Sequence, residues 1–170
     1  MKKRNLPYVF SLVISIFFLS CSSDDDAQIN TEQFLIANVN GVNFTSDETK
    51  QPLGFKRILM PSGRVNLYVK ALSAEGDILE FMVENFQGIG KYQLGSSYYT
   101  NSWMKFESPL RSESWLVGLQ KTLNLNANYI EISSVRDNYI EGKIFCSEMM
   151  NDLDGLMGAM EGEFRLVDLE

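Results

Sequence analysis

Short segments in which every second residue is apolar run through the chain from residue 34 to residue 168. In residues 64–71 the apolar positions are Val65, Leu67, Val69 and Ala71. This period of two is that of a β-strand with one buried face. Similar segments occur at 34–39, 42–46, 79–83, 91–94, 103–106, 114–119, 129–133, 140–146 and 163–168. About 8–10 strands joined by short turns predict an all-β fold, a single antiparallel β-sandwich or barrel.

Turn residues place neighbouring strands in hairpins. Asn40-Gly41 stands between two of the apolar segments. Both residue types tolerate positive φ angles, so the pair is typical of a two-residue type I′ turn. Residues 73–77 separate the 64–71 strand from the 79–83 strand in the same way.

Residues 149–160 break the alternating pattern. Their apolar residues recur at helical spacing: Met149, Leu153, Leu156, Met157 and Met160. Gly155 and Gly158 weaken a helix in this region. We therefore expect a loop with at most one helical turn.

The first 20 residues have the composition of an export signal. Lys2, Lys3 and Arg4 precede an apolar run from Leu6 to Leu19, which is shorter than the roughly 20 residues of a membrane-spanning helix. The run ends in Phe18-Leu19-Ser20-Cys21 and resembles the lipobox of bacterial lipoproteins, in which the cysteine is acylated and becomes the new N-terminus. We expect a signal peptide over residues 1–20 and membrane attachment through a lipid, such as palmitate, on Cys21. The alternative is an ordinary secretory signal that is cut after Ser23.

An acidic segment, Asp24-Asp25-Asp26, follows the expected lipidation site. It resembles the surface-export signal of Bacteroidota lipoproteins, and a solvated spacer is the alternative. We expect a flexible tether over residues 21–31 and one all-β domain over residues 32–170. This organisation predicts an outer-membrane lipoprotein exposed at the cell surface, with the periplasmic face as the alternative.

The charge of the chain argues against nucleic acid as a partner. Removal of residues 1–20 takes away three of the 15 basic residues, and the remaining 12 basic and 22 acidic residues give a net charge of −10. Nucleic acids and anionic head groups are bound by clusters of Lys and Arg. We therefore expect no nucleic-acid binding, and membrane attachment through the lipid alone.

The chain contains no histidine. Its absence excludes Ser-His-Asp and Cys-His nucleophile systems and the usual zinc sites. If Cys21 is acylated, Cys146 is the remaining thiol, and it lies on the apolar side of its segment. We expect an inert buried cysteine, no catalytic residue and no cofactor.

At Asn40-Gly41, Gly90, Gly142 and Gly162 the chain has motifs that resemble those of a group of uncharacterised Bacteroidota surface lipoproteins, a domain family of unknown function. The entry strands around Asn40-Gly41 are one, and Gly90-Lys91-Tyr92-Gln93-Leu94 is a turn followed by a strand. The closing strands contain Gly142 and Gly162. The resemblance covers most of residues 34–168 and implies the fold and the location, but no activity.

Aromatic residues in and near a loop are the best candidates for ligand binding: Tyr98, Tyr99, Trp103 and Trp115. Trp and Tyr are enriched where proteins bind flat ligands and partners. The alternative for each ring is that it covers the core.

Carboxylates offer weaker candidates. Asp152, Asp154 and Glu161 have the spacing of three ligands in a calcium loop, but Met150 occupies the first ligand position. An acidic surface turn is the alternative, and we expect no metal. The pairs Glu80/Glu84 and Glu131/Glu141 could serve a glycosidase, or could simply face water.

These features together predict a lipid-anchored envelope protein that is a non-enzymatic binding or accessory module. Its ligand would be a glycan, a small apolar molecule or an envelope protein. The alternatives are a carboxylate-dependent hydrolase that acts on glycans and a purely structural envelope protein.

Overall fold

The computed structural model describes residues 32–95, 101–117 and 126–170, and within these ranges the chain forms strands and no helix. Residues 32–170 make up one compact unit. The eleven strands are β1 (Phe34–Val39), β2 (Val42–Thr45), β3 (Phe55–Leu59), β4 (Val65–Leu72), β5 (Ile78–Val83), β6 (Gly90–Gln93), β7 (Trp103–Ser108), β8 (Glu113–Val117), β9 (Asn128–Arg136), β10 (Tyr139–Asn151) and β11 (Met157–Val167). The all-β prediction is confirmed.

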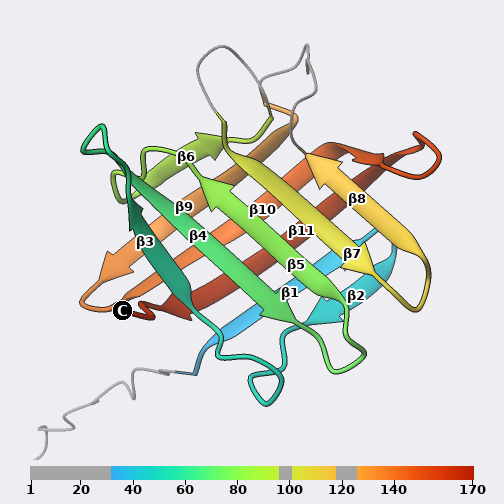
Figure 1. The fold of residues 1–170 in the computed structure, drawn as a ribbon, viewed down its shortest axis with the longest axis horizontal. Helices are drawn as coiled ribbons and strands as arrows, with labels where there is room; N and C mark the ends of the chain where they lie inside the picture. The colour runs from blue at the N-terminus through green and yellow to red at the C-terminus, as the bar shows by residue number, and fades with distance from the viewer. Residues whose placement is uncertain (1–31, 96–100, 118–125) are drawn as a thin grey trace, which may run out of the picture. The chain divides into compact units, whose positions relative to one another are not determined.

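All eleven strands belong to one curled antiparallel sheet with the main order β2-β1-β11-β10-β8-β7-β5-β4-β3. The curl depends on β10, which pairs with β9 along Tyr139–Cys146 and with β8 at Met150 and Asn151. In Figure 1, β3, β4, β5, β7 and β8 form a front layer that crosses the other six strands, the back layer, behind it. Single bridges, Ser46 to Ser73 and Phe55 to Asp168, join the two layers at their corners.

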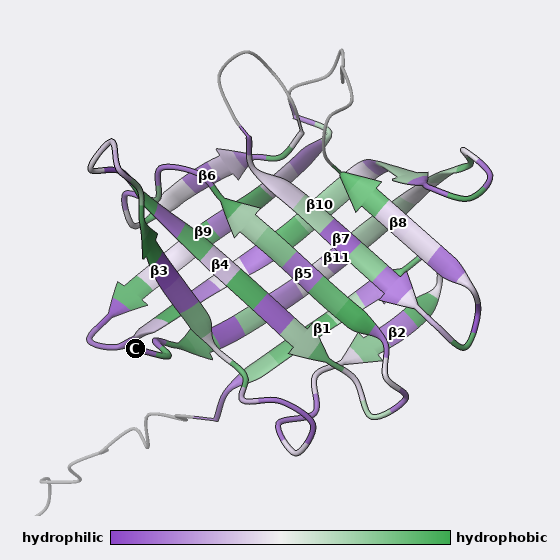
Figure 2. Ribbon diagram, in the orientation of Figure 1, coloured by the Kyte–Doolittle hydropathy of each residue, from purple (hydrophilic) through white to green (hydrophobic). Residues whose placement is uncertain are grey.

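The core lies between the two layers. Phe81 of the front layer packs against Phe164 of the back layer, with ring centroids 5.7 Å apart, and Phe44 meets the edge of Phe106 at 6.2 Å. Apolar and polar residues alternate along most strands, as Figure 2 shows, so most strands direct one face inward and one to solvent. A ligand can therefore contact the outward faces of the two layers.

Both predicted hairpins form, since β1 pairs with β2 and β4 pairs with β5, but the prediction for residues 149–160 fails. Asn40 and Gly41 have φ angles of 51° and 86°, so the predicted type I′ turn between β1 and β2 is confirmed. The predicted loop with a helical turn at residues 149–160 is wrong, because β10 continues to Asn151 and β11 begins at Met157. A β-bulge between Cys146 and Met149 leaves both side chains buried and interrupts the alternation.

The predictions for the N-terminal region fall on residues 1–31, which lie outside the described ranges. They are the signal peptide, lipidation at Cys21 and the acidic tether, and they stay predictions. In the part of the chain that is described, no helix is long and apolar enough to cross a membrane.

Candidate functional site

The outward face of the back layer carries an open groove of about 680 Å³. Strands β1, β2, β9, β10 and β11 supply its lining. Ligand pockets usually measure about 300–1,000 Å³, so the groove could hold a small molecule or one or two units of a polymer.

The antiparallel registers arrange the outward side chains of these strands in two rows across the sheet. The first row is Thr45, Ile36, Glu163, Lys143 and Glu131. The second row is Asn43, Asn38, Glu161, Phe145 and Tyr129. Neighbours in such rows have Cβ atoms about 4.5–5.5 Å apart, so residues distant in sequence act on one ligand.

Two stacked aromatic rings form the apolar part of the groove. The centroids of Tyr129 and Phe145 lie 5.2 Å apart, and the ring planes differ by 29°. The ammonium group of Lys91 lies 3.4 Å from the centroid of Tyr129. Because Phe145 stands between Tyr129 and Glu161 in its row, the side of its ring away from Tyr129 faces β11 and the groove. Both rings are half-buried, so they are fixed and still accessible.

Polar groups surround these rings. Three exposed carboxylates, Glu131, Glu161 and Glu163, and one ammonium group, Lys143, line the groove and give it a net negative charge. At the β1–β2 end, the Asn38 amide nitrogen donates a 2.9 Å hydrogen bond to Oδ1 of Asn43. The groove thus offers mostly hydrogen-bond acceptors, together with one cation and two amides.

The predicted aromatic site is divided by the structure. Tyr98 and Tyr99 lie outside the described residues. Trp103 is half-buried on the outward side of β7, beside Met82 of β5. Trp115 points inward and is 7% exposed; its Nε1 donates a 3.2 Å hydrogen bond to Glu113. The two tryptophans therefore lie on opposite faces of the front layer and do not form one site.

The three carboxylates with the spacing of a calcium loop, a weak candidate, are engaged elsewhere or lie far along β11. Asp152 accepts a 3.2 Å hydrogen bond from the Ser114 hydroxyl, and Asp154 accepts one of 3.0 Å from the backbone N–H of Leu156. Glu161 is four residues along β11 from Met157, a separation of about 13 Å in an extended strand. Among the described residues, no group of three His, Cys, Asp or Glu side chains could hold a metal ion.

Neither predicted carboxylate pair forms a cleft with two free acids. Glu80 accepts a hydrogen bond from the Tyr68 hydroxyl, and Glu84 accepts one of 2.9 Å from the backbone of Asn101. Four residues of extended chain separate them, about 13 Å, against at most about 9.5 Å in glycosidases. In the other pair, Glu141 lies 2.6 Å from Arg165.

Cys146 is 1% exposed and faces the core beside Met104, with the two sulfur atoms 3.9 Å apart. Burial raises the pKa of its thiol far above the ordinary range. A thiol held in its neutral form is neither a nucleophile nor a metal ligand.

Tyr129 and Phe145 are site residues that the sequence did not predict. The signal was present, because both are large aromatic residues at outward positions of their strands. Large aromatic side chains are usually buried, so an aromatic ring on a strand face that is expected to contact water indicates a binding surface.

The groove thus has the features of a binding site. We compared the chain with known proteins to find a related protein with a known ligand. The chain matches no protein-family model, no curated protein and no solved structure.

Proposed function

We propose that this protein is a lipid-anchored lipoprotein of the outer membrane, and that the groove on its back layer binds a glycan without catalysis. The export signal and Cys21 supply the anchor, and the acidic tether favours the cell surface over the periplasmic face. The domain then presents the groove to carbohydrate outside the membrane.

The observation that carries the glycan proposal is the Tyr129–Phe145 stack surrounded by carboxylates. A sugar ring has an apolar face of C–H groups and a rim of hydroxyl donors. The free side of Phe145 matches the apolar face, and Glu161 and Glu163 accept hydrogen bonds from the rim. The three carboxylates repel sulfated, phosphorylated or uronate sugars, so the expected ligand is a neutral or amino sugar.

The charged surroundings favour a glycan over a small apolar ligand. Apolar ligands are held in enclosed pockets with few polar groups, whereas this groove opens to solvent and carries four charged side chains. A glycan keeps part of its surface in water and uses the charged groups as hydrogen-bond partners.

A glycan array with the full chain, followed by calorimetry on the best ligand, tests the proposal. Phe145→Ala removes the stacking surface, and we expect about a tenfold loss of affinity, equivalent to about 1.4 kcal/mol. Glu163→Gln should weaken binding while preserving the side-chain shape. Trp103→Ala, on the other layer, is the matched control and should bind normally.

Two results would count against the proposal. Binding that survives Phe145→Ala and disappears with Trp103→Ala would move the site to the front layer. Release of new reducing ends from the bound glycan, lost in Glu161→Gln or Glu163→Gln, would instead identify a carboxylate-dependent hydrolase.

The anchor has a separate test. Cells grown with a palmitate analogue should label the wild-type protein, and Cys21→Ala should abolish the label. Digestion of intact cells with a protease should remove the domain if it is at the surface and spare it if it faces the periplasm.

A further inference from the structure

Exposed apolar side chains are concentrated at two hairpin ends. Nine large apolar residues are exposed among those described, and six of them belong to two hairpins. Ile58, Leu59 and Met60 lie in the first, which we call the β3–β4 tip (residues 56–64); Leu153, Leu156 and Met157 lie in the second, the β10–β11 tip (residues 152–157). Leu59 is 73% exposed and Leu153 is 68% exposed, so burial in the monomer does not explain them.

The two tips carry opposite charges. The β3–β4 tip has three basic residues, Lys56, Arg57 and Arg64, and no acidic one. Arg57 lies 3.3 Å from Asp168, which leaves Lys56 and Arg64 to dominate the outward field. The β10–β11 tip contains Asp152 and Asp154, and the whole stretch 147–164 has no Lys or Arg. Each tip thus combines apolar side chains with one sign of charge.

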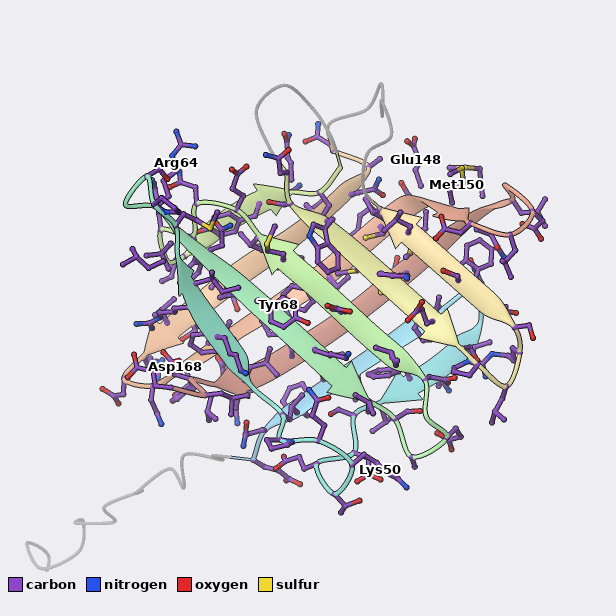
Figure 3. All side chains as sticks on the ribbon, viewed as in Figure 1. Lys50, Arg64, Tyr68, Glu148, Met150 and Asp168 are labelled. Carbon is purple, nitrogen blue, oxygen red and sulfur yellow. The ribbon has the colours of Figure 1, made fainter. Side chains whose placement is uncertain are left out.

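The tips lie at opposite ends of the domain. Figure 1 shows the turn after β3 at the left and the turn after β10 at the right, and in Figure 3 Arg64 and Met150 mark the same two ends. One tip therefore cannot reach the other within a single molecule. Two molecules placed end to end can bring them together.

We propose that the β10–β11 tip of one copy docks on the β3–β4 tip of a second copy. Leu153 and Leu156 would cover Leu59 and Met60, while Asp152 and Asp154 meet Lys56 and Arg64. Such a head-to-tail contact leaves one tip of each kind free, so it extends into an open chain of molecules. Two hairpin tips bury less than the roughly 1,200 Å² of a stable complex, so each contact is weak and reversible.

An anionic lipid surface is the competing occupant, and it matches one tip alone. Anionic head groups would attract Lys56 and Arg64 and repel Asp152 and Asp154. A contact between two copies instead pairs one basic tip with one acidic tip, and it covers the apolar residues of both. This difference allows the two occupants to be separated by experiment.

Sedimentation of the full chain in density-matched detergent tests the proposal. Variant one is Leu59→Glu/Met60→Glu, and variant two is Leu153→Lys/Leu156→Lys; neither removes a side chain that makes a hydrogen bond in a turn. The matched control is Leu110→Glu, an exposed residue in the β7–β8 turn, outside both tips.

The assemblies formed by the wild type and the control should increase in mass with protein concentration and exceed two chains. Each tip variant alone should lose about tenfold or more in association constant. An equimolar mixture should recover association but stop at two chains, because one intact tip of each kind remains. That recovery would also show that both variants are folded.

Three results would overturn the proposal. A wild type that stays monomeric at every concentration would do so. Self-association that variant one loses and variant two keeps would show a contact between two β3–β4 tips. Binding to phosphatidylglycerol vesicles that variant one alone loses, without self-association of the wild type, would assign the basic tip to a lipid surface.

Discussion

One added methyl group at Gly142 should strongly destabilise the domain. It is buried in β10, at the register shift between β9 and β10. A Cβ atom at this position would lie 2.5 Å from Cζ of Phe164 and closer still to the backbone oxygen of Glu131. Both contacts are far inside normal van der Waals distance, so Gly142→Ala must displace a neighbour.

The expected loss is about 3 kcal/mol of the free energy of unfolding. Overpacked core substitutions cost about 1–3 kcal/mol, and the upper end applies where a backbone atom must move. The other clashing group, Phe164, packs on Phe81 between the layers, so its displacement disturbs the core. For a domain of this size the loss corresponds to about 10 °C in Tm.

Urea unfolding followed by circular dichroism measures the effect, with Gly90→Ala as the control. A Cβ atom at Gly90 would meet Tyr92 at 3.9 Å and 4.0 Å, which are ordinary contacts. Gly→Ala at a compatible backbone position stabilises by about 0.4–1 kcal/mol, because it restricts the unfolded chain. If the two variants unfolded within about 1 kcal/mol of each other, the close approach of β9, β10 and Phe164 would be refuted.

Three further predictions follow from burial and hydrogen bonding. Burial, and then the hydrogen bond to Glu80, raise the pKa of Tyr68 to about 12. An unfolded tyrosine ionises at about pH 10, so the free energy of unfolding should fall as the pH rises between these two values. Urea midpoints measured across that range should fall less steeply in Tyr68→Phe than in the wild type. Figure 3 shows Tyr68 on the front layer, and a spectrophotometric titration should find a tyrosine step near pH 12 that Tyr68→Phe removes. Because burial raises the pKa of Cys146, its thiol should react with a disulfide reagent no faster than the domain unfolds, and rapid labelling of the native protein would contradict this burial. Phe164→Ala should lower the free energy of unfolding, measured by calorimetry, by about 3–5 kcal/mol. Arg165→Ala removes a partly exposed ion pair and should lower it by less than about 1 kcal/mol. Equal losses in the two variants would refute the burial pattern of β11.

The sequence predicted those strands that bury one face. The alternation at Leu67 and Val69 corresponds to buried positions of β4, and Phe164 and Leu166 point inward from β11 as expected. Strand β3 was missed, because Lys56 through Leu59 are exposed at every position and show no alternation. Alternation reports burial of one face, so an edge strand exposed on both faces does not show it.

The groove could not be predicted, because it depends on the register of several strands. Glu163, Lys143 and Glu131 form a row only once β11, β10 and β9 are aligned, and no local pattern determines that alignment. The predicted candidates Trp103 and Trp115 are aromatic residues in and near a loop of the sequence. The structure places them in β7 and β8, facing opposite ways.

The pleat of the back layer separates the proposed binding face from the residues of the core. In β10, Phe145 faces the groove and the next residue, Cys146, faces the core; in β11 the same holds for Glu163 and Phe164. Outward substitutions such as Glu163→Gln leave the inter-layer packing intact, because successive side chains of a strand point to opposite faces of the sheet. Loss of binding in an outward variant can therefore be assigned to the groove when its unfolding midpoint is unchanged. A fold of this kind can change its proposed ligand through the outward face of the five strands that line the groove, and its core sets no limit on that change.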